Sequence, residues 1–380
     1  MKYANVLPIV SVALAIGVEA KVPFNRTFTY INTGSYAMYD NEYGADYRAI
    51  NMVVHGFQMT FYNTTPNAYT LALRLGTPYS QSERAFIWEA NRAKPVRENA
   101  VFALRSDGNL LLQEADGHTV WQSNTANKGV VDYALLPNGN LVLLDAKGNY
   151  VWQSFDWPTD TLLVDQYLKL GGTTKLVSRA SRKVNVDGSY SLELEPTRFA
   201  LYYTSPIDSK RYVYFSSTKW FNVSNGPLKR ITLVTNPKDK NLASYEISLN
   251  YESSISGKVG IARPKFNPVY SYMRLGIDGN LRVYSFDDDV HWDAWETTFE
   301  LFGRSGKWQS ECELPSRCGS YGVCQDNMCV SCPKGQADGS DPFLPWHVNC
   351  TAQTLKTCLP GAIQYYELVG VKHFSTQYTK

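Results

Sequence analysis

The chain has 380 residues, which at roughly 150 residues per domain predicts two to three folded units. Charged residues make up only 19% of it, against about 25% in average globular proteins, and the formal net charge of +2 argues against a nucleic-acid binder or an acidic tail. Hydrophobic residues at 44% and aromatic residues at 13% are too abundant for a disordered chain.

The first twenty residues are typical of a secretory signal peptide. Lys2 is followed by an apolar run from Val6 to Val18 and by small residues around Ala20, after which we expect cleavage. The run is shorter than the ~20 residues of a spanning helix, and no later stretch is apolar enough to cross a bilayer. A buried N-terminal strand is the alternative. We therefore expect a secreted protein without a membrane span.

Asn-x-Ser/Thr sequences are consistent with secretion, because they are acceptors for N-glycans. The candidate glycosylation sites are Asn25, Asn63, Asn222 and Asn349.

Three repeats, each ending in a tryptophan, follow in the chain. Trp88, Trp121 and Trp152 are 33 and 31 residues apart, and Gln-Ser follows the last two. Asp107–Leu110 and Asn138–Leu141 both match Asx-Gly-Asn-Leu, and Asx-Gly pairs suit tight hairpin turns between strands that have one apolar face. The pattern predicts a threefold β-prism with its tryptophans packed toward the axis, the alternative being an ordinary β-sandwich.

Alternating apolar and polar residues continue beyond residue 168, as in half-buried strands. Met273–Tyr284 contains the Asp-Gly-Asn-Leu turn again. We therefore expect a second, diverged copy of the same kind of domain. No fifteen-residue window sustains the i, i+3, i+4 apolar pattern of a helix, so the predicted fold class is all-β.

All seven cysteines lie between Cys312 and Cys358. In a secreted chain this density predicts a disulfide framework, and six cysteines allow fifteen pairings among which sequence alone does not choose. A zinc site at Cys329-Val-Ser-Cys332 is the rival interpretation, which an oxidising compartment disfavours. Cys358 is the odd cysteine.

Four segments resemble plant extracellular glycoproteins with bulb-type (mannose-binding) lectin domains, the group that includes S-locus glycoproteins and the ectodomains of S-domain receptor kinases. The segments are Trp152–Leu163, Tyr272–Tyr284, Cys318–Cys324 and Gln364–Phe374. The chain looks most similar to the epidermis-specific secreted glycoprotein type, which lacks a membrane span and a kinase. The resemblance implies two β-prism II domains, a small EGF-like module and a truncated PAN/apple-like start.

The resemblance also implies a disulfide pattern. In an EGF-like module the pairs would be Cys312 with Cys324, Cys318 with Cys329, and Cys332 with Cys350. Cys358 would begin the PAN/apple-like domain, whose remaining cysteines are absent.

In bulb-type lectins each mannose pocket follows the strand pattern Gln-x-Asp-x-Asn-x-Val-x-Tyr, whose polar groups hydrogen-bond sugar hydroxyls. Three rows of this chain keep only part of it. The candidate carbohydrate-binding residues are Arg105, Asp107, Asn109 and Gln113 in the first row, Asn138 and Asn140 in the second, and Asp278, Asn280 and Tyr284 in the third. Loss of the Gln, and usually of the Tyr, removes hydrogen bonds worth about 1 kcal/mol each, so the usual mannose sites are expected to be degenerate.

Two interpretations of the remaining residues stay open. The Asx-Gly-Asn residues can form turns and strand ends without any sugar. Alternatively, Arg105 and Gln113 rebuild a pocket for another glycan, because arginine forks onto carboxylates such as those of uronic acids.

Enzyme sites are not evident. The five histidines lack ligand spacing, there is no Gly-x-Ser-x-Gly turn, and the run Asp287-Asp288-Asp289 before His291 is better interpreted as a solvated loop than as a metal site. We therefore expect no catalytic residues, no metal and no cofactor.

The sequence predicts a plant cell-wall or apoplastic glycoprotein that binds wall glycans or has a structural role in the epidermal wall. The alternative is protein recognition in signalling, with the lectin-like domains as a scaffold. Partners are extracellular glycans or proteins, and a homodimer is plausible. The expected divisions are a signal peptide over 1–20, an N-terminal segment over 21–46, lectin-like domains over 47–167 and 168–303, an EGF-like module over 308–350, and a PAN/apple-like start over 351–380.

Overall fold

The alternating sequence folds into β-strands joined by tight turns. The computed structural model describes residues 21–76, 83–220, 225–237, 243–264, 270–287, 295–319, 322–333, 343–345, 369–376 and 378. Its helices within these residues are short 3-10 turns, namely η1 (Phe24–Arg26), η2 (Glu42–Gly44), η3 (Ser154–Asp156), η4 (Ser217–Trp220) and η6 (Glu311–Glu313). The expected signal peptide over 1–20 lies outside the described residues.

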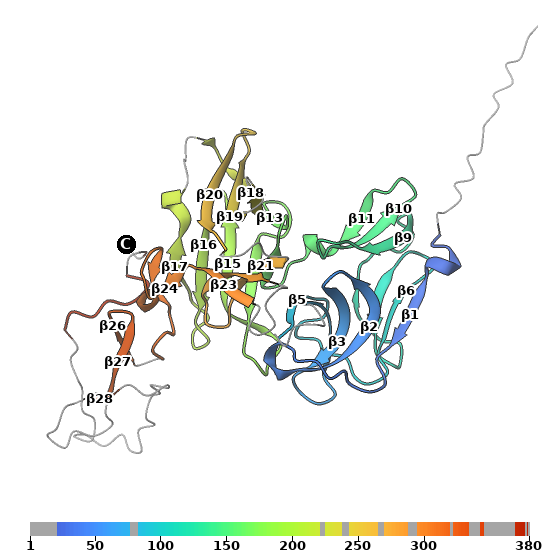
Figure 1. Ribbon diagram of the computed structural model, residues 1–380, viewed down its shortest axis with the longest axis horizontal. Helices are drawn as coiled ribbons and strands as arrows, with labels where there is room; N and C mark the ends of the chain where they lie inside the picture. The colour runs from blue at the N-terminus through green and yellow to red at the C-terminus, as the bar shows by residue number, and fades with distance from the viewer. Residues whose placement is uncertain are drawn as a thin grey trace, which may run out of the picture.

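Three antiparallel sheets form a first unit around one apolar core, to the right in Figure 1. The first sheet contains β2 (Asp46–Val54), β3 (Phe57–Asn63), β4 (Tyr69–Leu75) and β5 (Ala85–Glu89). The second has the order β1-β6-β7-β8, with β1 (Phe28–Ile31), β6 (Val101–Leu104), β7 (Leu110–Gln113) and β8 (Thr119–Gln122). The third has the order β11-β10-β9, with β9 (Val130–Leu135), β10 (Leu141–Asp145) and β11 (Tyr150–Gln153).

The three repeat tryptophans meet at the centre of the first unit. The ring centroids of Trp88, Trp121 and Trp152 lie 5.8 to 6.2 Å apart, and each pair is edge-to-face. Each tryptophan stands opposite a leucine of the neighbouring strand, Leu73, Leu112 or Leu143. Each of the three repeats contributes one tryptophan and one leucine to this centre. The threefold arrangement expected from the tryptophan spacing is therefore present.

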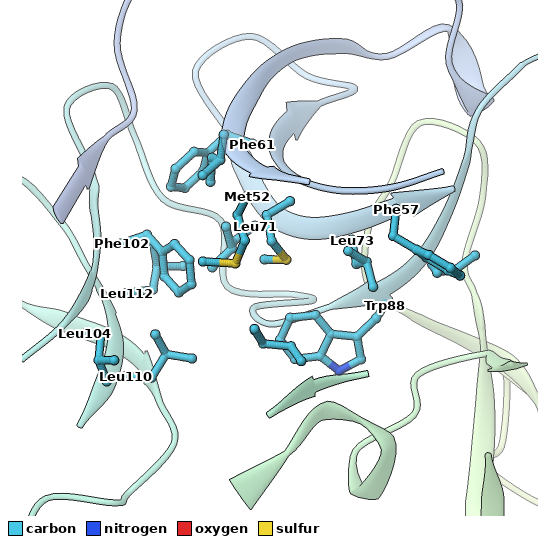
Figure 2. Close-up of a cluster of buried hydrophobic side chains, with 14 of the residues drawn as sticks. Met52, Phe57, Phe61, Leu71, Leu73, Trp88, Phe102, Leu104, Leu110 and Leu112 are labelled. Atoms are coloured by element: carbon cyan, nitrogen blue, oxygen red, sulfur yellow. The ribbon is translucent and has the colours of Figure 1, made fainter. Parts of the chain in front are cut away.

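Apolar side chains from two of the sheets fill the space beside Trp88. Figure 2 shows leucines of β4 facing Phe102 of β6 and leucines of β7, with Met52 of β2 between them. Alternate residues of a strand point to the same face, so the Leu-x-Leu spacing places three leucines of β4 and two of β7 in this core. This packing holds the sheets in place and leaves their outer faces for other contacts.

Three further four-stranded sheets form a second unit around a separate core. One sheet has the order β12-β21-β22-β23, with β12 (Thr161–Leu163), β21 (Tyr270–Leu275), β22 (Leu281–Phe286) and β23 (Trp295–Glu300). Another has the order β13-β18-β19-β20, with β13 (Tyr167–Lys169), β18 (Leu228–Pro237), β19 (Ala243–Tyr251) and β20 (Ser256–Ala262). The last contains β14 (Lys175–Arg179), β15 (Asp187–Glu195), β16 (Arg198–Thr204) and β17 (Arg211–Ser216).

Two strands pair outside the stretches expected for their domains. β1 lies within 21–46, yet it is hydrogen-bonded to β6 in register from Phe28 opposite Leu104 to Ile31 opposite Val101. β12 precedes residue 167, yet it pairs with β21 of the second unit. Each of these strands forms the edge of a sheet whose other strands lie later in the sequence. The sheets of the two units therefore do not follow the domain boundaries expected from the sequence.

The β12-β21-β22-β23 sheet is a wall shared by both cores. Met273 and Val283 point into the second core, whereas Tyr272 and Tyr284, one residue away, pack against the first. This follows from the period of two in a strand. Tyr270 also meets Phe57 of the first unit edge-on at 5.6 Å. The two units therefore contact each other through an aromatic face.

Asp160 forms ion pairs at the contact between the two units. It lies directly before β12 and is 4% exposed. Its Oδ2 accepts a hydrogen bond from Arg92 Nη2 at 2.9 Å, and Arg274 Nε of β21 lies 3.8 Å from its Oδ1. Arg274 also pairs with Glu42 of η2 and donates to the carbonyl of Phe86. Burial alone would raise the pKa of Asp160, but the two guanidinium groups outweigh it and lower that pKa.

A third arginine completes the cluster. Arg179, at the end of β14 and 1% exposed, donates from Nη1 to Tyr62 Oη at 2.6 Å and lies 3.4 Å from Glu89 Oε1. Glu89 Oε2 also accepts from Arg92 Nε at 2.6 Å. The buried cluster thus joins three arginines to three carboxylates, so no net charge is left without compensation.

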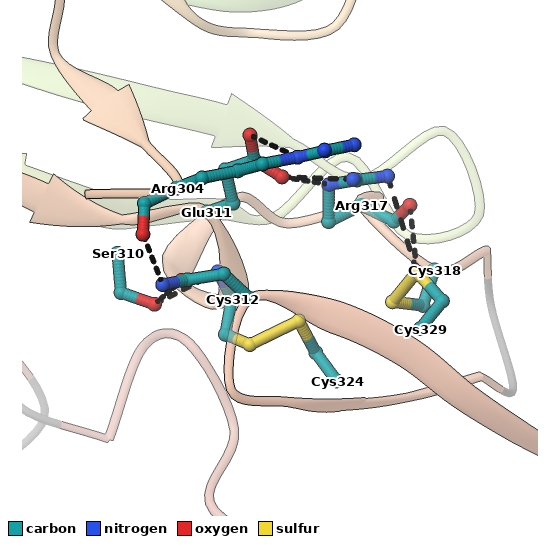
Figure 3. The surroundings of a disulfide bond; sticks show 9 residues. Arg304, Ser310, Glu311, Cys312, Arg317, Cys318, Cys324 and Cys329 are labelled. Atoms are coloured by element: carbon teal, nitrogen blue, oxygen red, sulfur yellow. Dashed lines mark hydrogen bonds and ion pairs between the residues drawn. A yellow bond between two sulfur atoms is a disulfide. The ribbon is translucent and has the colours of Figure 1, made fainter. Parts of the chain in front are cut away.

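Two disulfides stabilise the chain after the second unit. Cys312 is bonded to Cys324 and Cys318 to Cys329, the first two pairs that the family resemblance implies. Arg317 reaches from the Cys318 turn to Glu311 at 2.8 Å, as Figure 3 shows. The expected partner of Cys332, Cys350, lies outside the described residues, as does Cys358.

Short strands accompany these disulfides. β24 (Phe302–Gly303) and β25 (Gln309–Ser310) pair in parallel, and β26 (Val323–Gln325), β27 (Met328–Pro333) and β28 (Phe343–Pro345) form a three-stranded sheet. Within the described residues, no helix is long and apolar enough to cross a membrane.

We expect Asp160→Asn to lower the free energy of unfolding by about 3–5 kcal/mol at pH 7, because it leaves buried guanidinium charge without its partner. Since folding depresses the pKa of Asp160, its contribution is present above the unfolded value of about 3.9 and is lost as the pH falls through the folded value. The difference between variant and wild type should therefore shrink below about pH 4. Urea unfolding across pH measures it, with the exposed Asp326→Asn as control. An equal difference at pH 3 and pH 7 would contradict this assignment.

Candidate carbohydrate-binding rows

The Asx-Gly-Asn-Leu and Trp-Gln-Ser sequences form one repeated hydrogen-bonded unit. Asn109 Nδ2 donates to Gln122 Oε1 at 2.8 Å, and the backbone N–H of Leu110 donates to Ser123 Oγ at 3.0 Å. The next repeat makes the same two bonds, from Asn140 to Gln153 and from Leu141 to Ser154, at 2.8 and 2.9 Å. The start of the second strand of each repeat is thereby tied to the end of the third strand, beside the tryptophan.

The turns preceding these strands require glycine. Gly108, Gly139 and Gly279 have φ of 84°, 85° and 80°, in the left-handed region that other residues disfavour. In each turn the Asp or Asn before the glycine accepts a hydrogen bond from the backbone N–H two residues later, at 2.9 to 3.2 Å. These bonds engage one carboxylate or amide oxygen of Asp107, Asn138 and Asp278 within the protein.

Asn109, Asn140 and Asn280 are 7%, 3% and 1% exposed. Their amide groups are all used internally. For example, Asn280 Nδ2 donates to the carbonyl of Phe302 at 2.7 Å, and its Oδ1 accepts from the N–H of Phe302 at 3.0 Å. The interpretation that these asparagines tie strand ends accounts for their described contacts.

The row on β7 keeps exposed polar groups. The Arg105 side chain is exposed, and its Nη2 donates to Gln113 Oε1 at 2.7 Å. Gln113 Nε2 in turn donates to the carbonyl of Gly117 and to Thr119 Oγ1, both at 3.0 Å. Gln113 on β7 therefore holds the guanidinium of Arg105, which lies in the turn before that strand, in one position.

The other two rows are closed or apolar. On β10 the alternate positions are Leu136, Val142 and Leu144, which offer no hydrogen-bonding side chain, and Val142 is fully buried. On β22 Arg282 donates to both carboxylate oxygens of Asp278, at 3.0 and 2.7 Å.

Tyr284, the last residue of the β22 row, is packed inside the protein and is not free to contact a sugar. Its ring stacks on Tyr272 with centroids 5.1 Å apart and packs against the first core, and burial raises the pKa of its hydroxyl. In the β22 row the exposed Asp278 is already paired with Arg282, whereas in the row on β7 the exposed Arg105 is held by Gln113, a neutral side chain.

The first sheet has no such row because the chain itself covers its outer face. Tyr43 and Ala37 pack on a cluster that includes Tyr62, Ala72 and Phe86. Arg74 on β4 occupies the position that corresponds to Gln113 on β7. Each of the two residues directly follows the leucine that lies opposite a tryptophan, Leu73 or Leu112. It is 7% exposed and stacks on Tyr47 at 4.0 Å.

Sequence reasoning missed the internal partners of the asparagines. Gln122, Ser123, Gln153 and Ser154 lie in the repeated Trp-Gln-Ser that marks the repeats, and this repetition was the available signal. The segment that contains Ala37 and Tyr43 and covers the first sheet has no comparable repeated sequence.

The glycosylation sites differ in exposure. Asn25 is exposed, whereas Asn63 is 5% exposed and its Nδ2 lies 3.5 Å from Tyr36 Oη. Asn222 and Asn349 lie outside the described residues, as do Asp288, Asp289 and His291. Within the described part of the chain, no group of three or more His, Cys, Asp or Glu side chains is arranged to hold a metal ion.

The family model for D-mannose binding lectins matches residues 85–183. The epidermis-specific secreted glycoprotein EP1 of Daucus carota is 44% identical over 92% of this chain and 92% of its own length, and EP1-like glycoprotein 3 of Arabidopsis thaliana is 42% identical over 96% of this chain and 81% of its own. The chain belongs to the family of EP1 and EP1-like glycoproteins. The resemblance drawn from sequence motifs is confirmed.

More distant relatives of this EP1-family chain include a G-type lectin S-receptor-like serine/threonine-protein kinase of Arabidopsis thaliana, 30% identical over 64% of this chain and 28% of the kinase. Among solved structures, the two-domain fetuin-binding lectin of Scilla campanulata is similar over 70% of this chain and 93% of that one, at 17% identity and a TM-score of 0.22. The all-β architecture of this family member rests on its own strands, and its lectin fold on the D-mannose binding lectin model that matches residues 85–183.

We expect Asn109→Ala to destabilise the protein by about 1–3 kcal/mol, because it removes buried hydrogen bonds and leaves Gln122 Oε1 without its donor. Arg105→Ala, at an exposed position, should stay within about 0.5 kcal/mol of wild type. Urea unfolding of both variants tests this difference. Equal stability of the two would show that Asn109 does not tie the strands.

We expect an N-glycan at Asn25 and none at Asn63. A glycan on Asn63 Nδ2 would displace Tyr36, which also hydrogen-bonds Tyr69 at 2.7 Å. Enzymatic deglycosylation in heavy-oxygen water followed by peptide mass spectrometry marks each occupied asparagine, and Asn25→Gln provides the control. An occupied Asn63 would be incompatible with this packing.

Proposed function

We propose that this protein is a secreted, non-enzymatic glycoprotein of the plant apoplast and cell wall that binds a glycan through the exposed row on β7. The observation that carries the proposal is the Arg105 guanidinium, which is exposed and oriented by a hydrogen bond of 2.7 Å to Gln113 Oε1. A fixed guanidinium fork suits vicinal acceptors and carboxylates, as in uronic acids. The row lacks the Gln and Tyr of mannose pockets, so mannose is not the proposed ligand.

The extracellular part of the proposal is supported by the relatives, since the carrot protein is named an epidermis-specific secreted glycoprotein. The disulfides Cys312–Cys324 and Cys318–Cys329 suit an oxidising compartment. The divisions expected from the sequence, with two lectin-like domains, an EGF-like module and a PAN/apple-like start, remain part of this proposal. The epidermal wall is the proposed place of action.

A glycan and pectin array probed with the glycosylated mature protein tests this function. We expect binding to acidic oligosaccharides, and Arg105→Ala should weaken the affinity of the β7 row for them at least about tenfold, because it loses a charge-assisted hydrogen bond. Lys147→Ala, at an exposed turn outside the row, is the matched control.

Absence of glycan binding, or binding that Arg105→Ala leaves unchanged, would overturn the proposed role of the β7 row. Capture of a wall protein that free oligosaccharide does not compete away would favour protein recognition instead.

A further inference from the structure

A cleft of about 1090 Å³ opens on the second unit, away from the β7 row. Its walls are β19 and β20 on one side, β23 on another, and residues 303–311 on the third. Both β20 and β23 are the last strands of their sheets, so two sheet edges meet here without joining. The volume is at the upper end of the roughly 300–1,000 Å³ of small-molecule sites, which leaves room for several sugar rings.

The carboxylates in the cleft are already paired. Glu246 Oε2 lies 3.2 Å from Lys258 Nζ, Glu300 Oε1 lies 2.9 Å from Arg282 Nε, and Glu311 lies 2.8 Å from Arg317. In Figure 3 both Arg304 and Arg317 extend toward Glu311. The negative charges of this cleft are therefore compensated before any ligand arrives.

The exposed charges at the cleft are mostly positive. The side chains of Glu246 and Glu311 are 16% and 15% exposed and that of Glu300, paired with Arg282, is 41% exposed, whereas that of Arg304 is 80% exposed. Arg263 and Lys307 are also exposed, and neither forms an ion pair within the part of the chain that the structure describes. An anionic ligand would find three cations with their charge directed to solvent.

Neutral groups of the lining suit a sugar. Ser244, Thr297 and Ser305 offer hydroxyls that both donate and accept hydrogen bonds. Trp308 lines the cleft half-buried, held edge-on between Trp220 and Phe299 at 5.3 and 5.7 Å. A fixed indole is an apolar surface for a sugar ring, while its neighbours bind the hydroxyls.

We propose that this cleft is a second binding site, for an oligosaccharide of uronic acids, in which Arg263, Arg304 and Lys307 bind the carboxylates and Trp308 contacts a ring. A peptide is the less favoured occupant. Two sheet edges would pair with an extended chain, but peptide recognition also needs apolar pockets for side chains. Ile261 and Phe299 are only 3% and 4% exposed and offer little such surface.

The test uses the glycosylated full chain, with tetragalacturonate as the probe and calorimetry in low salt with a chelator that removes calcium. We expect saturable binding that is at least about tenfold weaker for the double variant Arg263→Glu/Lys307→Glu, since two contacts to carboxylates are reversed. The fully methyl-esterified tetrasaccharide and maltotetraose have no free carboxylate and should bind at least about tenfold more weakly to the wild type.

Controls separate this site from the β7 row and from unspecific charge effects. The cleft variants and their reference protein all carry Arg105→Ala, so the β7 row does not contribute to the measured binding of tetragalacturonate, and adding Lys147→Glu should leave that binding unchanged. Failure of the β7 proposal and failure of this one are therefore distinguishable. If the charge-reversed variant loses its native melting transition, Arg263→Gln/Lys307→Gln supplies the same comparison with neutral side chains.

Three results would overturn the proposal. They are no saturable binding of tetragalacturonate, the same affinity in the cleft variants as in wild type, and equally tight binding of hexaglutamate, which would indicate an acidic peptide.

Discussion

The buried ion cluster between the two three-sheet units is the constraint on which the rest of the molecule depends. Arg92, Arg179 and Arg274 come from three separate segments, and Asp160 and Glu89 each lie within 4 Å of two of them. Removing one member of such a cluster leaves a buried charge unpaired, which costs several kcal/mol. The units are therefore held at one mutual orientation, in which Tyr284 of β22 packs against the first core.

The repeat signature in the sequence predicted the centre of the first unit well. The spacing of Trp88, Trp121 and Trp152 reflects a local rule, since each tryptophan must face a leucine of its own hairpin. The Asx-Gly pairs likewise report a backbone requirement that is decided within a few residues. Periodicity and turn chemistry act over short distances, so both survive in a single sequence.

Contacts between distant segments were not predictable in the same way. Arg274 and Glu42 are 232 residues apart, and nothing in the composition around either residue marks it as a partner of the other. The covering of the first sheet by Tyr43 and its neighbours depends on the same tertiary arrangement. The candidate rows illustrate the consequence. The sequence placed Asp278 and Tyr284 in one row, and in the structure Asp278 lies in the turn before β22 and Tyr284 on β22. Arg282 and the first unit decide what those side chains can reach.

The pairing of β12 with β21 has a consequence for synthesis of the chain. Leu162, fully buried in the second core, lies opposite Met273, which is translated more than a hundred residues later. At 5–20 residues per second this interval is on the order of ten seconds, during which the apolar strand has no partner. Non-local pairing of this kind also raises contact order and slows folding. β12 therefore emerges from the ribosome well before β21, and the second core cannot close until that late strand has been made.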